Sequence, residues 1–186
     1  MNNSPLVEAS VFLIQTIFGL FILAVLLRLI LQIVRADFHN PLSQALVKIT
    51  NPVLVPLRRF IPGTGGFDMA SVLLIITLKL IELTLTSLLT TGGIIISQLL
   101  LLTLAELLSL ILWFFTISII VQVILSWVNP NSYNPVASLL YSVNEPILGP
   151  ARRLIPAMGG LDLSPMIVLI IFQLIRIILV NPLYHL

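Results

Sequence analysis

The sequence predicts an all-α membrane protein with about four transmembrane helices, arranged as two tandem hairpin repeats of parallel orientation. Hydrophobic residues make up 59% of the chain and charged residues only 9%, a composition typical of integral membrane proteins. Four apolar runs have the roughly 20 residues that a helix needs to cross the hydrocarbon core. In addition, the block at positions 40–81 recurs at 134–175 without a gap.

The four apolar runs are predicted to be spans near 6–34, 69–90, 94–128 and 163–180. Leucine and isoleucine dominate them and do not alternate with polar residues, which favours helices over barrel strands. The first and third runs are longer than a simple span, so we expect them to tilt or to project into water. The first run carries Glu8 and lacks a basic leader and a cleavage signal, so it is interpreted as a retained helix.

Each repeat is expected to hold two spans joined by a structured segment, with the first repeat at 1–91 and the second at 92–186. The recurring block reads Asn-Pro, then Pro-x-Leu-x-Pro-x-Arg-Arg-x-Ile-Pro, then Gly-Gly-x-Asp. An even number of spans per repeat gives both copies the same orientation, so their symmetry axis follows the membrane normal.

The joining segment is predicted to start as a short amphipathic helix in the lipid interface, over 42–49 and 136–143. Asn40 and Asn134 can cap its free amides, and the proline after each fits the first helical turn. A plain connecting loop is the alternative. Later prolines are expected to break each helix into short pieces; they are Pro52, Pro56 and Pro62, and Pro146, Pro150 and Pro156.

Two glycines and an aspartate precede the second span of each repeat. Paired glycines suit a flexible corner, and an aspartate at a helix start can cap the amides and complement the positive end. Proton transfer is the alternative role for the aspartates. These residues are Gly65, Gly66 and Asp68, and Gly159, Gly160 and Asp162.

The arginine pairs Arg58-Arg59 and Arg152-Arg153 leave three interpretations open. They can set topology and extend toward lipid phosphate, bind anionic lipid specifically, or bind a protein or solute partner. No lysine or arginine occurs in the amino-terminal segment, in the 90–93 turn or in the 181–186 tail. The positive-inside rule therefore predicts that both arginine pairs are cytoplasmic and that both termini lie on the opposite, periplasmic side.

Besides Glu8 near the start of the first run, five charged residues fall within the apolar runs, where a charge is costly unless it is paired or hydrated. Arg28 lies near the cytoplasmic end of its span, within reach of the interface. The other four, Lys79, Glu82, Glu106 and Arg176, can form structural pairs or an ion or proton path. The candidate pairs are Glu82 with Arg176, and Glu106 with Arg176 or Lys79. These four charges are not duplicated between the repeats, which weakens the transport interpretation.

The sequence offers no catalytic or cofactor-binding pattern. It contains no cysteine, and His39 and His185 have no companions at metal-ligand spacing. A phosphate loop at 63–66 lacks its lysine, and no basic and aromatic pattern suggests nucleic acid. The sequence implies no enzyme, no metal and no cofactor.

The duplicated motif, flanked by apolar helices over nearly the whole chain, resembles the YggT family, also called YlmG, in its two-repeat form. The resemblance implies a bacterial inner-membrane protein linked to osmotic or envelope stress and potassium homeostasis. Other relatives are linked to cell division or plastid cytochrome assembly. No catalytic residue is implied, and the copies differ at Asn51 against Glu145 and at Ser71 against Pro165.

Two functions are expected from these observations. The first is a scaffold or homeostasis factor whose cytoplasmic proline and arginine elements contact anionic lipid, a membrane-protein partner or a second copy of the chain. The alternative is a small channel or transporter that affects potassium or osmolyte balance. The interfacial segment is duplicated, whereas the intramembrane charges are not. This difference favours the scaffold or homeostasis factor.

Overall fold

The computed structural model describes residues 4–63, 67–93, 95–128, 134–154 and 162–184, and this part of the chain is helical. Four helices are long and apolar enough to cross a membrane. They are α1 (Pro5–Ile33), α3 (Met69–Thr90), α4 (Ile96–Val128) and α6 (Ser164–Ile175), the last extended by a π-helical turn, Arg176–Val180, and a 3-10 turn, Asn181–Tyr184. The predicted fold class is therefore confirmed.

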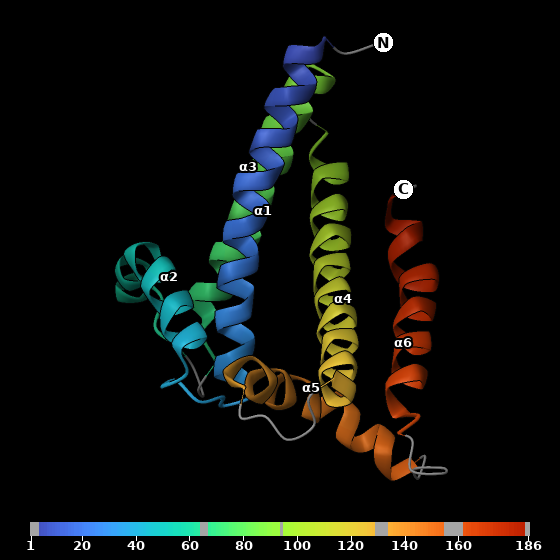
Figure 1. Ribbon diagram of the computed structural model, residues 1–186. Helices are drawn as coiled ribbons and strands as arrows, with labels where there is room; N and C mark the ends of the chain where they lie inside the picture. The colour runs from blue at the N-terminus through green and yellow to red at the C-terminus, as the bar shows by residue number, and fades with distance from the viewer. Residues whose placement is uncertain (1–3, 64–66, 94, 129–133, 155–161, 185–186) are drawn as a thin grey trace.

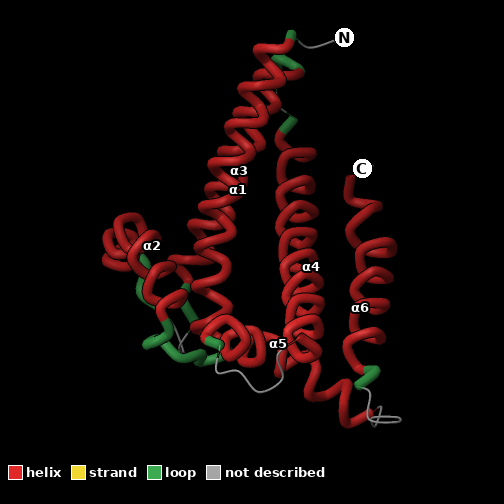
Figure 2. The backbone as a smooth tube through the Cα atoms, in the orientation of Figure 1, coloured by secondary structure: helices red, strands yellow, loops and turns green. Residues whose placement is uncertain are grey.

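The two shorter helices, α2 (Pro41–Phe60) and α5 (Pro135–Leu154), lie across the ends of the spans. Figure 1 shows α1 packed along α3, with α4 and α6 forming the second pair beside them. In Figure 2, α2 and α5 are at the same end of the molecule, opposite the amino terminus. We call this end the arginine face, because both arginine pairs belong to α2 and α5.

Four of the prolines that were expected to break the interfacial helices lie inside them without breaking them, so for these four the expectation was wrong, whereas α2 does end before Pro62. Helix α2 continues through Pro52 and Pro56, and α5 continues through Pro146 and Pro150. A spacing of four residues places both prolines of a helix on one face, and that face is exposed. The carbonyl groups that lose their amide partners therefore also lie on the exposed side, where water or headgroups can satisfy them.

The opposite face of each interfacial helix holds it against the spans. Leu54 of α2 is 0% exposed and Leu148 of α5 is 1% exposed, and these residues occupy the same position in the two repeats. Leu54 belongs to a cluster built mainly from α1 and α3, and Leu148 packs with Ile119 and Val168 of the second repeat. This packing explains why each helix extends beyond the 42–49 and 136–143 segments predicted for it.

One polar contact joins the two repeats at the arginine face. The Asn40 side chain caps α2 by accepting a hydrogen bond from the Leu42 amide at 3.0 Å. Its Nδ2 also donates to the carbonyl oxygen of Pro135, the first residue of α5, at 2.8 Å. The same asparagine therefore starts one interfacial helix and ties it to the start of the other.

The end of α1 is shaped by a residue in the left-handed conformation. Arg35 has a φ of 53°, the Ala36 amide donates to the Leu31 carbonyl at 2.9 Å, and the Arg35 amide donates to the Gln32 carbonyl at 3.2 Å. This pattern is a Schellman motif, whose left-handed position usually holds glycine. It turns the chain out of the span and toward α2.

We therefore expect Arg35→Gly to stabilise the protein. Glycine removes the Cβ clash of a left-handed residue, and its greater unfolded-state entropy offsets part of that gain, leaving about 0.5–1 kcal/mol. Denaturant unfolding of the purified protein in detergent measures the change. Arg35→Ala is the matched control, because it removes the same charge but keeps the Cβ. An equal gain in both variants would show that charge, not backbone strain, is responsible.

Candidate functional site

A buried arginine holds α2 against the first span. Arg28 of α1 is buried, and its Nη1 donates to Thr50 Oγ1 at 2.6 Å and to Asn51 Oδ1 at 2.8 Å. Thr50 is itself 0% exposed. Near the hydrocarbon core, such bonds are favoured because no water replaces them. Arg28 therefore anchors the interfacial helix and does not simply extend to the interface.

Neutral side chains make the corresponding contact in the second repeat. Asn144 of α5 donates from Nδ2 to Gln122 Oε1 at 2.7 Å, and its Oδ1 accepts from Ser118 Oγ at 3.0 Å. Gln122 and Asn144 occupy the repeat positions of Arg28 and Thr50. Each first span thus binds its interfacial helix at the same place, with a cation in one repeat and an amide in the other.

The first arginine of each pair contacts the aspartate at the start of the next span. Arg58 pairs with Asp68 through two contacts, of which the Nε to Oδ1 distance is 3.4 Å. Arg152 donates from Nε to Asp162 Oδ2 at 2.9 Å and from Nη1 to Glu145 Oε2 at 2.7 Å. These ion pairs join the end of each interfacial helix to the following span.

Both aspartates also bind the start of that span. Asp68 accepts from the Ser71 amide at 3.4 Å and from its hydroxyl group, and Asp162 accepts from the Ser164 amide at 2.9 Å. The second repeat uses Ser164 because position 165 is proline, which has no amide hydrogen. Asp68 is the N-cap residue of α3, whereas Asp162 lies one residue before the N-cap of α6, Leu163. Both aspartates still bind the helix start, through partners that differ by one position in the repeat alignment.

These contacts shift the acidity of the groups at the arginine face. Burial opposes ionisation of Asp68, but hydrogen bonds from Arg58 and Ser71 together hold its pKa below the ordinary value of 3.8. Asp162 behaves likewise, since bonds from Ser164 and Arg152 outweigh burial and lower its pKa. For Arg152, burial is outweighed by Asp162 and Glu145, which raise its pKa. All three groups are therefore charged at neutral pH.

The second arginine of each pair has a different environment. Arg59 and Arg153 are exposed, and neither makes an ion pair with any described residue. Neighbouring residues point about 100° apart on a helix, so one arginine can face the following span while the next faces outward. Each Arg-Arg pair is thus divided into an inward arginine and an outward arginine.

Three of the four charged residues Lys79, Glu82, Glu106 and Arg176 are in contact with one another. Lys79 Nζ lies 2.9 Å from Glu82 Oε1 and 3.6 Å from Glu106 Oε2, so one cation serves two carboxylates. Arg176 shares a 220 Å³ pocket with Lys79 and Glu106 but forms no ion pair with a described residue. Glu82, which was expected to pair with Arg176, is 3% exposed and bonds to Lys79, while its Oε2 has no hydrogen-bond partner among the described residues.

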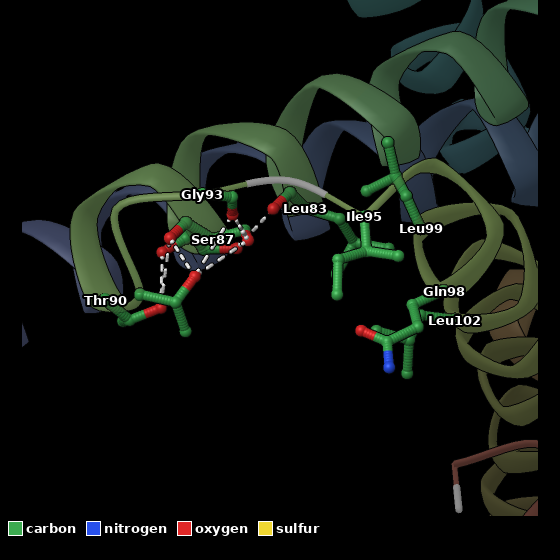
Figure 3. Close-up of a pocket in the computed structure, with 10 residues that line it drawn as sticks. Leu83, Ser87, Thr90, Gly93, Ile95, Gln98, Leu99 and Leu102 are labelled. Carbon is green, nitrogen blue, oxygen red and sulfur yellow. Dashed lines mark hydrogen bonds between the residues drawn. The ribbon is translucent and has the colours of Figure 1, made fainter. Parts of the chain in front are cut away.

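Two further cavities are lined by uncharged side chains. A 620 Å³ pocket beside the turn between α3 and α4 is lined by hydroxyl and apolar side chains, as Figure 3 shows. Its hydroxyls are already used, since Ser87 Oγ donates to the Gly93 carbonyl at 2.7 Å and Thr91 Oγ1 to the Ser87 carbonyl at 2.9 Å. The other, a 680 Å³ cleft between the repeats, is lined by apolar residues of α1, α3, α4 and α5 and by Phe67.

Some predicted positions lie outside the described residues. They are Gly65, Gly66, Gly159 and Gly160 of the predicted corners, together with Pro156 and His185. Within the described part of the chain, no group of three histidines, aspartates or glutamates is arranged to hold a metal ion.

The docking role of Arg28, Thr50 and Asn144 was missed from the sequence. The available signal was that positions 28 and 122, and positions 50 and 144, are polar at the same places in two largely apolar repeats. When two repeats make the same contact with different side chains, the equivalent positions stay polar although the residues differ.

Comparison with known proteins places the same duplication in a family context. A family model described as CCB3/YggT matches residues 7–89 and again 101–183. An uncharacterised protein of Pseudomonas aeruginosa is 48% identical over 94% of this chain and 90% of its own length. The uncharacterised YggT protein of Escherichia coli K12 is 39% identical over 89% of this chain and 86% of its own. No solved structure matches the chain significantly.

The lowered pKa of Asp68 predicts acid sensitivity. The ion pair contributes fully to stability above the unfolded-state value, near 3.8, and this contribution is lost as pH falls through the lower folded-state pKa. We expect Asp68→Asn to cost about 1–3 kcal/mol at pH 7, through lost charge-assisted bonds, and less at pH 3, which lies below the unfolded-state pKa.

Denaturant unfolding in detergent at both pH values measures this. Asp162→Asn is the comparison variant, and a smaller loss is expected because the Asp162 side chain is 40% exposed, against 4% for Asp68. A loss in Asp68→Asn that is equally large at pH 3 would contradict the role of its charge.

Proposed function

The chain belongs to the CCB3/YggT family, and we propose that it is a non-enzymatic inner-membrane protein that holds anionic lipid through the outward arginines Arg59 and Arg153. In this proposal the arginine face is cytoplasmic, as the positive-inside rule predicts. The protein acts as a lipid-contacting scaffold in osmotic or envelope stress. The interfacial helices α2 and α5 are its working surface.

The observation that carries the proposal is that Arg59 and Arg153 are exposed and form no ion pair with a described residue. Both occupy the same repeat position, and both follow an arginine whose charge is already used by an aspartate. A guanidinium group matches phosphate geometry with two parallel hydrogen bonds. A lipid phosphate supplies the anionic partner that the described protein residues do not.

Exposed apolar side chains stand next to both arginines. Phe60 is 83% exposed and Leu154 is 82% exposed, again at equivalent positions of the repeat. An apolar side chain at the interface inserts among acyl chains, while the neighbouring arginine reaches the phosphate level. The combination of an exposed cation and an exposed apolar residue suits a membrane surface better than it suits water.

The decisive experiment compares the double variant Arg59→Gln, Arg153→Gln with wild type in lipid mixtures of phosphatidylglycerol and phosphatidylethanolamine. An arginine near an anionic surface contributes about 1 kcal/mol, or about fivefold in affinity. We expect the double variant to lose most of the enrichment of phosphatidylglycerol that co-purifies with the protein, and to impair growth after osmotic shock. Mass spectrometry of bound lipid measures the first effect.

The matched control is Arg35→Gln, Lys48→Gln, which also removes two unpaired positive charges near the arginine face. We expect it to keep most of the enrichment, because neither cation recurs in the second repeat, where the equivalent residues are Asn129 and Ser142. Unchanged lipid enrichment in a correctly inserted Arg59 and Arg153 double variant would refute the proposal.

A second candidate function is ion movement. It is favoured by the Oε2 of buried Glu82, which has no hydrogen-bond partner among the described residues, and by the nearby pocket that Lys79, Glu106 and Arg176 line. Potassium flux into proteoliposomes tests this. Under the leading proposal, wild-type vesicles show no flux above protein-free vesicles. Flux that disappears in Glu82→Gln, with Glu8→Gln as the exposed control, would instead establish the channel.

A further inference from the structure

Two polar pockets occupy equivalent places in the two repeats. The first has a volume of 510 Å³ and lies between α1, the end of α2 and the start of α3. The second, of 370 Å³, lies between α4, α5 and the start of α6. Four lining positions correspond in the repeat alignment: Arg28, Gln32, Arg58 and Asp68 in the first, and Gln122, Ser126, Arg152 and Asp162 in the second. The duplication has therefore preserved a pocket as well as a fold.

The pockets share an ion pair but differ in net charge. Arg58 with Asp68, and Arg152 with Asp162, contribute no net charge to either pocket. Arg28 adds one positive charge to the first pocket, whereas the neutral Gln122 holds its place in the second. Glu145, where the first repeat has Asn51, adds a negative charge on Arg152 at 2.7 Å. The first pocket is thus cationic and the second is not.

Arg28 has donors left for a ligand. Only its Nη1 is used in the bonds to Thr50 and Asn51, and Nε and Nη2 make no bond to a described residue. Arg58 also lines the pocket, and its side chain is 35% exposed. Two guanidinium groups with spare donors, on different helices, are the arrangement that binds a phosphate group.

We propose that the first-repeat pocket binds one phosphate-type anion through Arg28 and Arg58, and that the second-repeat pocket has lost this capacity through Gln122 and Glu145. This deepens the proposed function by adding a single built site to the contacts of the outward arginines. The shared ligand chemistry is that of a lipid phosphodiester or of free phosphate. The net charge of the pocket neutralises one negative charge, that of a phosphodiester.

The surroundings favour the lipid as source of this anion. Phe67 lines the cationic pocket and also lines the 680 Å³ apolar cleft between the repeats. A phosphate group in the pocket would therefore lie next to this apolar cleft, into which an acyl chain can extend. Apolar residues Leu26 to Val34 of the cleft run about 12 Å along α1, at 1.5 Å per residue.

The experiment exchanges the anchors between the repeats. The loss variant, Arg28→Gln with Thr50→Asn, installs the amide pair that already docks α5, so α2 keeps a hydrogen-bonded anchor without the cation. The gain variant, Gln122→Arg with Asn144→Thr and Glu145→Asn, installs the cationic anchor in the second repeat. Native mass spectrometry counts phosphatidylglycerol retained from nanodiscs, and titration of detergent-solubilised protein with inorganic phosphate tests the free anion.

We expect one retained anion in wild type, none in the loss variant and two in the gain variant. The expected weakening in the loss variant is about ten- to hundredfold, as for the loss of a charge-assisted hydrogen bond. Retention of phosphatidylglycerol alone identifies the lipid as ligand, and saturable binding of inorganic phosphate identifies the free anion; both support the site. Equal retention in wild type, loss and gain variants overturns it, and the gain variant decides if the loss variant fails to fold.

The outcome is separable from that of the proposed function. The double variant Arg59→Gln, Arg153→Gln leaves both pockets intact, so we expect it to lose general lipid enrichment but to keep the single tightly retained anion. If the enrichment persists in that variant while the loss variant releases its anion, the proposed role of the outward arginines fails and the pocket stands. If the anion remains in the loss variant, the pocket fails whatever the outward arginines do.

Discussion

The hydrogen bond between each first span and its interfacial helix is the contact on which the arginine face depends. Arg28 with Thr50, and Gln122 with Asn144, fix α2 and α5 at one height relative to the spans. Where water is scarce, a polar side chain that leaves its partner has nothing to replace it. Different side chains can meet this requirement: a cation bonded to a hydroxyl group in the first repeat, and two amides bonded to each other in the second.

Fixing the interfacial helices determines what two adjacent arginines can do. The inward arginine meets the aspartate that binds the start of the following span, so one ion pair joins the end of the interfacial helix to that span. The outward arginine is then carried away from the protein by the helical rotation alone. Under the proposed function, a single Arg-Arg dipeptide thus has two roles: the inward arginine stabilises the fold and the outward arginine binds lipid. The cationic pocket arises where the inward arginine and the Arg28 anchor meet.

The sequence was sufficient for the spans and the duplication, because apolar runs and repeated motifs are local signals. Asn40 and Asp68 were likewise identifiable as cap positions from the residues that follow them. The course of α2 through Pro52 and Pro56 was not predictable in this way, because it depends on the burial of Leu54 and on where the prolines face. The partner of Glu82 also could not be read from the sequence, since Lys79 on its own helix competed with Arg176 on another.

The hydrogen bond from Asn40 to Pro135 bears on how such a chain arises. Its donor belongs to the first repeat, and its acceptor is a backbone carbonyl at the position that corresponds to Pro41. A polypeptide with only one repeat would therefore possess both the donor and the acceptor. Two such polypeptides could form across their mutual boundary the bond that this chain forms internally. Fusion of the two copies turns an association that depends on concentration into one fixed by the covalent chain, and it frees each half to change its charge separately.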